Sequence, residues 1–177
     1  MIEQKQAFKL CIFGDGGVGK STLIRRYVTK VFEEKTKMTI GADFSVKNLE
    51  VDGKNVTLRI WDFAGEERFR VLLPSFVKGA DGGIFMYDVT RYSTLNNIKD
   101  WLSIFKYFVS NDQTRIPIIM IGGKADLQDQ RSVKPEEAKE LSKNYNLQGF
   151  YECSSKTGDN VEIIFEDITR KMLENRE

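Results

Sequence analysis

A glycine-rich segment at 14–21, GDGGVGKS, constrains the fold of this chain more than any other feature. It follows an apolar, β-prone run at 8–13 and leads into a helical stretch from Lys20 to Thr29. Its spacing matches G-x-x-x-x-G-K-[ST], in which backbone N–H groups surround a phosphate and the helix N-terminus favours its negative charge. The alternative is a glycine-rich turn without a ligand, but every position of the pattern is matched. The segment therefore predicts a phosphate-binding loop between a strand and a helix.

The same loop offers groups for a nucleotide and for magnesium. Lys20 can reach the β- and γ-phosphates, and the Ser21 hydroxyl supplies an oxygen ligand of the kind that Mg²⁺ prefers. A second element, Asp62-Phe63-Ala64-Gly65, follows a strand and matches D-x-x-G. Its aspartate can hold magnesium through water, and the Gly65 N–H can contact the γ-phosphate. The nucleotide-binding residues predicted in the loop are Gly16, Gly17, Val18, Gly19, Lys20, Ser21 and Thr22.

Strand and helix patterns alternate along the rest of the chain. Two alternating segments, 44–51 and 56–60, flank Asp52-Gly53, which is a strong hairpin signal. Further strand signals lie at 83–89, 116–121 and 150–153, and helical signals at 95–105, 135–145 and 161–172. This order predicts an α/β fold: a six-stranded, mainly parallel sheet with one antiparallel hairpin strand and helices on both faces. We expect a single domain over residues 1–177.

Composition excludes several functional classes. The 27 Lys and Arg nearly balance the 26 Asp and Glu, so no basic stripe indicates a nucleic-acid partner. The chain has no histidine, which removes histidine acid–base chemistry and disfavours a catalytic zinc site. Segment 1–6 is polar, and no apolar run approaches the ~18 residues of a membrane span. Cys11 and Cys153 lie in apolar or β-prone stretches and predict buried free thiols in a reducing compartment, so we expect a cytoplasmic location.

Several further motifs resemble the Rab branch of the Ras superfamily and appear in the order typical of that family. They are TIGADF at 39–44, WDFAGEERFR at 61–70, YDVT at 87–90, KADL at 124–127 and ECSSKTG at 152–158. The resemblance extends from Phe8 to the final helix. It implies a P-loop NTPase G domain that binds GTP and GDP with Mg²⁺, hydrolyses GTP slowly, and acts in membrane trafficking or signalling.

The resemblance also implies roles for individual residues. Thr39 would bind magnesium and the γ-phosphate, and Phe32 would flank the base. Asp126 can accept two hydrogen bonds from a guanine edge, which adenine cannot supply. For Lys124 and Asp126, the alternative is a solvated surface loop. The remaining base contacts implied are Lys124, Ser154, Ser155 and Lys156, and the metal set implied is Ser21, Thr39 and Asp62.

Two positions depart from the family pattern. Gly123 stands where the family has asparagine, so we expect weaker base binding unless water or a neighbour substitutes. Glu66 replaces the glutamine that orients the attacking water. A carboxylate can accept a hydrogen bond from that water, but it repels the γ-phosphate, so the substitution alone does not fix the rate. Gly16 leaves the loop free of a side chain, which favours retained hydrolysis. The expected catalytic set is Glu66, Lys20 and Gly65.

Contacts with partner proteins are expected at the two switches, 39–44 and 61–70. Phe44, Trp61 and Phe76 fall where Rab proteins carry an aromatic triad, although packing of these rings in the core is an equal alternative. We expect effectors, exchange factors and GTPase-activating proteins to bind there, and the protein itself to be a monomer. Arg68 and Arg70 are expected to contact solvent or a partner, so a partner would supply the missing positive charge. Segment 172–177 holds no cysteine and thus no prenylation motif, which leaves membrane association open.

Three function classes follow from these patterns. The first is a GTP-hydrolysing switch, which the order of the motifs favours. The second is a guanine-nucleotide-binding interaction module with little or no hydrolysis, suggested by Gly123 and Glu66. The third is a P-loop kinase or ATPase, which the sequence disfavours because it shows no acceptor site and no adenine-specific feature.

Overall fold

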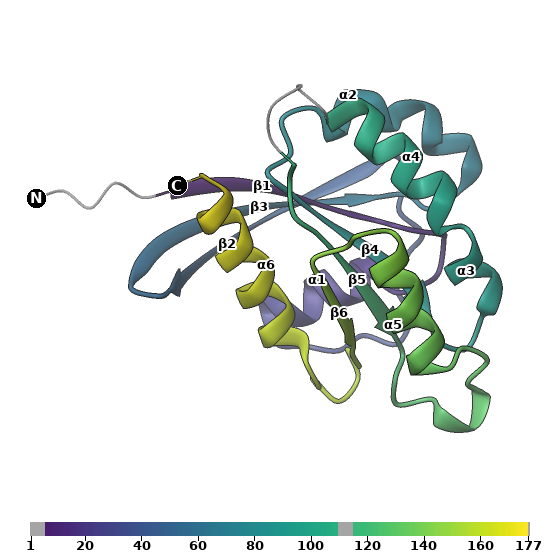
Figure 1. Cartoon of the computed structure of the whole chain (residues 1–177). Coiled ribbons are helices and arrows are strands. Elements are labelled where there is room, and N and C mark those ends of the chain that lie inside the picture. Colours follow the sequence, from purple (N-terminus) through teal and green to yellow (C-terminus); the bar gives the residue numbers. More distant parts are fainter. Residues whose placement is uncertain (1–5, 110–114, 177) are drawn as a thin grey trace, which may run out of the picture.

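A six-stranded mixed sheet forms the centre of the computed structural model, which describes residues 6–109 and 115–176, and helices cover both of its faces (Figure 1). The strands lie in the order β2-β3-β1-β4-β5-β6. Their bounds are β1 Gln6–Phe13, β2 Ala42–Val51, β3 Lys54–Phe63, β4 Gly82–Asp88, β5 Ile118–Gly123 and β6 Gly149–Glu152. The helices are α1 Lys20–Thr29, α2 Leu73–Val77, α3 Tyr92–Asn96, α4 Ile98–Val109, α5 Pro135–Asn144 and α6 Val161–Arg176, with 3₁₀ turns η1 Glu67–Leu72 and η2 Gln128–Gln130.

One strand pair is antiparallel and the other pairings are parallel, as the sequence predicts. Strands β2 and β3 form the hairpin, with Val51 opposite Lys54. Its two turn residues, Asp52 and Gly53, both have positive φ, at 51° and 75°. Two such residues match a type I′ turn, whose twist suits the strands that it joins. The predicted α/β fold is therefore confirmed.

Two hydrophobic clusters fix the helices onto the sheet. On one face, α1 and α6 pack together, and the rings of Tyr27 and Phe165 stack with centroids 3.9 Å apart. On the other face, Trp101 and Phe105 of α4 pack on Phe13, with the Phe13 and Phe105 centroids 4.5 Å apart. Strands β4 and β5 are buried along their whole length, which explains their continuous apolar runs.

Some element boundaries differ from the expectations. The helical pattern at 95–105 is divided into α3 and α4 at Asn97. Strand β5 begins at Ile118, two residues later than expected, because Pro117 has no N–H to donate to a ladder. Elements η1 and α2 were not predicted, since η1 buries no side chain and shows no helical period.

Both cysteines are free and buried, as predicted. Burial raises the pKa of each thiol to about 12, so both are neutral at physiological pH. Across 6–109 and 115–176, every helix is too short or too polar to span a bilayer.

Candidate functional site

The candidate site lies where the parallel strands end. In such a sheet, the loops that follow the carboxyl ends of the strands meet at one edge. Segment 14–19 follows β1, Asp62 is near the end of β3, and 124–127 follows β5. Segment 154–156 follows β6 at the same edge. The topology therefore gathers the predicted phosphate, metal and base residues from distant parts of the sequence.

Lys20 lies inside the curve of the phosphate loop. Its ammonium donates to the carbonyl oxygens of Gly14, at 2.9 Å, and Asp15, at 2.7 Å. The residue is buried, and this burial lowers the pKa of Lys20 to about 8, although nearby Asp62 and Asp15 favour the charged form. Two carbonyl oxygens of the loop thus hold the Lys20 ammonium inside its curve.

Three oxygen-bearing side chains meet beside Lys20. The Ser21 hydroxyl contacts a carboxylate oxygen of Asp62 and lies 2.9 Å from the Thr39 hydroxyl. The other oxygen of Asp62, Oδ1, is buried without a hydrogen-bond partner in the described part of the chain. Burial raises the pKa of Asp62, opposed by the Ser21 hydrogen bond and by Lys20. Two hydroxyls and an orphaned carboxylate oxygen form a donor set that fits a hard cation.

Gly65 lies directly on the phosphate loop. A β-carbon there would overlap the backbone of Asp15 and Gly16, so this close approach requires glycine. The neighbouring Glu66 points its carboxylate to Arg68, at 2.7 Å, and Arg68 is largely exposed. A β-carbon on Gly16 would lie 3.7 Å from Cγ of Glu66. The two residues expected to act on the attacking water and the γ-phosphate therefore adjoin the loop.

A cavity of about 240 Å³ lies on the other side of the loop. Its lining combines predicted site residues with Glu34, Met86 and Leu127, which sequence reasoning did not assign to the site. The predicted members of the lining are Val18, Gly19, Thr22, Phe32, Lys124, Asp126, Ser155 and Lys156. The cavity is thus lined by the start of α1 and by the two segments expected to contact the base, 124–127 and 154–156.

Asp126 is held by the segment after β6. The buried Ser154 hydroxyl donates to Oδ1 of Asp126 at 2.7 Å and accepts from the Thr157 N–H at 3.1 Å. The N–H of Ala125 donates to the carbonyl of Cys153 at 3.0 Å. These bonds fix the carboxylate at the cavity wall. The predicted role of Ser154 as a base contact stays a prediction, but the structure shows it positioning Asp126.

The place of the expected asparagine is filled by Met86. A β-carbon on residue 123 would overlap the Cε methyl of Met86 and lie 3.2 Å from the Val18 carbonyl oxygen. Gly123 has no positive φ, so a side chain there meets no backbone strain, but it requires the flexible end of Met86 to move away. Sequence reasoning missed this pairing because Met86 is on a different strand.

Asp88 at the end of β4 is a further residue that sequence reasoning did not assign to the site. Its buried carboxylate accepts from Lys124 at 2.7 Å, and from the Thr90 N–H at 2.8 Å and hydroxyl at 2.7 Å. Burial alone would raise the pKa of Asp88, but these bonds outweigh it and lower the pKa. Lys124 also donates to the Gly17 carbonyl at 2.9 Å. Lys124 thereby joins the segment after β5 to the phosphate loop.

The expectation that Arg70 contacts solvent is corrected by its contacts, whereas its role in partner binding stays a prediction. Its guanidinium lies 4.5 Å from the ring centre of Trp101 and 3.6 Å from the Asp15 carboxylate. Asp15 in turn accepts from Asn97 Nδ2 and Trp101 Nε1, each at 2.7 Å. Arg70 is therefore largely buried against the phosphate loop and α4 rather than facing solvent, while Arg68 is exposed as expected.

The three aromatic residues expected to face partners form one cluster. Phe44 lies 5.2 Å from Trp61, and Trp61 lies 5.7 Å from Phe76, measured between ring centres. Phe44 is exposed, whereas Trp61 and Phe76 are partly buried. The cluster thus combines core packing with an accessible apolar surface beside both switches.

Comparison with known proteins agrees with this geometry. The Ras family model matches residues 9–174. GTP-binding protein ypt1 of Schizosaccharomyces pombe is 39% identical over 172 residues, covering 97% of this chain and 83% of the relative. Ras-related protein Rab-9A of Rattus norvegicus is 38% identical over 98% of this chain and 86% of its own length, and Rab-18-B of Danio rerio is 39% identical over 94% and 79%. The chain belongs to the Ras family and is a small GTPase of the Rab-like kind.

Proposed function

We propose that this protein is a single-domain guanine-nucleotide switch that binds GTP and GDP with Mg²⁺, slowly hydrolyses GTP and recruits effectors in membrane trafficking. One observation carries the proposal. The loop at 14–21 has an oxygen-rich cluster around Asp62 on one side and the cavity that contains Asp126 on the other. A nucleoside phosphate would use both, with its phosphates and their metal near Asp62 and its base in the cavity. The names of the relatives, GTP-binding protein and Ras-related Rab proteins, support the same function.

The metal end is proposed to consist of Ser21, Thr39 and Asp62. Mg²⁺ takes oxygen ligands and needs few of them from the protein, because waters and substrate phosphates supply the rest. Ser21 and Thr39 would ligate directly, and Asp62 through water. Magnesium, when bound, supplies positive charge at the β- and γ-phosphate oxygens. The orphaned Oδ1 of Asp62 supports this assignment.

Hydrolysis is proposed to depend on positioning and charge. Lys20 and the loop N–H groups would hold the γ-phosphoryl oxygens, and the Gly65 N–H would contact the same group. Glu66 would accept a hydrogen bond from the attacking water, while its charge opposes the phosphate. Arg68 already pairs with Glu66 and so offsets part of that charge. This arrangement favours slow turnover, and the Glu66 carboxylate keeps a binding module with little hydrolysis as the second candidate.

Partner binding is proposed at the switches. Ile40 lies in the first switch and Val71 directly follows the second, and both side chains are 75% exposed. The same two segments contribute Phe44 and Trp61 to the aromatic cluster. Apolar groups on such segments give a partner a surface that changes with the bound nucleotide. Effectors, exchange factors and GTPase-activating proteins are the proposed partners.

The function is tested by nucleotide competition followed by single-turnover phosphate release. We expect GTP and GDP to displace mant-GDP while ATP does not, and phosphate to be released slowly. Glu66→Gln is the matched comparison, and we expect it to release phosphate about tenfold faster, because an amide can donate to the γ-phosphate without repelling it. Equal displacement by ATP would refute the guanine assignment. Without phosphate release from either protein, the binding-module candidate would replace the switch enzyme.

The Met86–Gly123 pair gives a second test of the base end. We expect Gly123→Asn alone to loosen GDP binding and lower the melting temperature, because the new side chain overlaps Met86. Adding Met86→Val opens space, and the double variant should release mant-GDP several-fold more slowly than Gly123→Asn, since one recovered hydrogen bond is worth about 0.5–1.5 kcal/mol. Stopped-flow release from the parent, both single variants and the double variant measures this coupling. Additive effects of the two substitutions would contradict it.

A further inference from the structure

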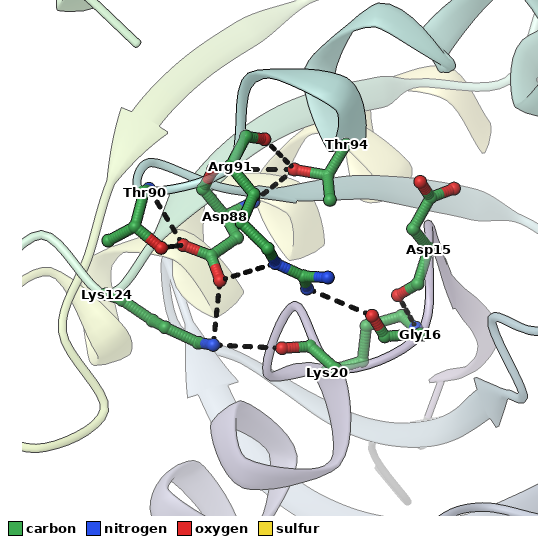
Figure 2. Close-up of polar contacts among 9 residues, drawn as sticks. Asp15, Gly16, Lys20, Asp88, Thr90, Arg91, Thr94 and Lys124 are labelled. Atoms are coloured by element: carbon green, nitrogen blue, oxygen red, sulfur yellow. Dashed lines mark hydrogen bonds and ion pairs between the residues drawn. The ribbon is translucent and has the colours of Figure 1, made fainter. Parts of the chain in front are cut away.

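Arg91 extends from the turn after β4 onto the phosphate loop. Its backbone is fixed, because its N–H donates to the Asp88 carbonyl and its own carbonyl accepts from Thr94. Its guanidinium bridges two acceptors: Nε lies 3.2 Å from Asp88 Oδ2, and NH2 donates to the Gly16 carbonyl at 3.0 Å. Figure 2 shows the guanidinium between the two acceptors, with the Asp88 carboxylate on one side and Gly16 on the other. The planar guanidinium of arginine can donate to two separate acceptors from different nitrogens, whereas the single ammonium of lysine does not suit such a bridge.

Two cations therefore hold two consecutive carbonyls of the loop. Arg91 donates to Gly16 and Lys124 to Gly17, and both also pair with Asp88 (Figure 2). In a trans peptide, the C=O and the following N–H point in opposite directions, and the described residues contain no cis peptide. A donor on the Gly16 carbonyl thus directs the Gly17 N–H to the opposite side. In a phosphate-binding loop the backbone N–H groups surround the phosphate, so the phosphate is expected on that opposite side.

A side chain at position 123 would approach a different carbonyl. The β-carbon of such a residue would lie 3.2 Å from the oxygen of Val18, but Met86 occupies the space. The loop is instead held one and two residues earlier, through Gly17 and Gly16. Arg91 supplies the earlier of these contacts and adds a permanent positive charge beside the loop.

We propose that Arg91 is a positioning residue of the phosphate site: it fixes the Gly16–Gly17 peptide so that the Gly17 N–H faces the β-phosphate of the bound nucleotide. The inference rests on the proposed binding of guanine nucleotides. The role proposed for Arg91 is indirect, because its guanidinium donates to the Gly16 carbonyl and acts on the phosphate only through the orientation of that peptide. Its effect should therefore depend on the β-phosphate and not on the base.

The test compares the affinities for mant-GDP and mant-GMP, measured from association and dissociation rates on nucleotide-free protein. We expect Arg91→Met to lower the ratio of GDP to GMP affinity by about tenfold, since hydrogen bonds to charged groups are among the stronger ones. Arg91→Lys, which keeps the charge but cannot bridge both acceptors, should lose several-fold. The matched control is Arg170→Met, because Arg170 is 41% exposed against 45% for Arg91 and likewise pairs with an aspartate, Asp52.

The outcomes separate this inference from the proposed function. If the parent protein gains no affinity from the β-phosphate, the proposed function fails. If the parent prefers GDP but Arg91→Met keeps its ratio, or loses GDP and GMP affinity equally, the positioning role is overturned. If Arg91→Met does not fold, the ratio for Arg91→Lys decides in the same way. A matching change in Arg170→Met would also overturn the inference.

Discussion

Asp126→Asn should exchange the guanine preference of this protein for a xanthine preference. Guanine presents two donors to the Asp126 carboxylate, whereas xanthine presents one donor and one acceptor, which suit an amide. Ser154 donates to Oδ1 of Asp126, so the amide of the variant can keep that bond through its oxygen and turn its NH₂ to the base. Mispairing at a site built for hydrogen bonding costs on the order of 10⁴-fold in selectivity.

Competition of GTP and XTP measures this exchange, with mant-GDP as the probe for the parent protein and mant-XDP as the probe for the variant. Asp129→Asn is the matched control, because Asp129 is an exposed aspartate in η2, three residues further along the chain. The control should keep the parent preference. If Asp126→Asn keeps its preference for GTP, Asp126 is not part of the base site, and the assignment of the phosphate site is unaffected.

Ser21→Asn should abolish the dependence of nucleotide binding on magnesium. The Ser21 hydroxyl lies among the oxygens of Thr39 and Asp62, where a longer amide would occupy the place of a cation. We expect GTP affinity to fall by about 100-fold or more and GDP affinity by less, because the γ-phosphate adds charge that the metal must offset. Ser21→Thr keeps the hydroxyl and is the matched control.

Release of mant-GDP and mant-GTP, with and without EDTA, measures the role of the metal. EDTA should accelerate release from the parent protein and from Ser21→Thr, but have little effect on Ser21→Asn. If release from the parent is indifferent to EDTA, then Ser21, Thr39 and Asp62 do not form a metal site.

The sequence predicts those features that depend on neighbouring residues. The loop at 14–21, the turn at Asp52-Gly53 and helix α1 follow from local spacing, and the structure has each of them. The sheet follows because apolar runs alternate with helical periods. The order of the motifs then indicates that 14–21 and 124–127 meet, since both follow parallel strands.

Contacts between distant residues are what the sequence does not reveal. Met86 fills the space beside Gly123 from another strand, and Arg91 reaches Gly16 across 75 positions. Neither contact leaves a periodic signal in the chain. Arg70 shows the same difficulty, because a charged residue in an irregular segment is ordinarily solvated, yet here it stacks on Trp101.

The shared carboxylate of Asp88 has a consequence for regulation. Through Lys124 and Arg91, this one group supports both the segment proposed to face the base and the loop proposed to face the phosphates. Lys124 also donates to the Gly17 carbonyl, so a partner that displaced the segment with Lys124 would remove one contact of the loop, while Arg91 would still join Asp88 to Gly16.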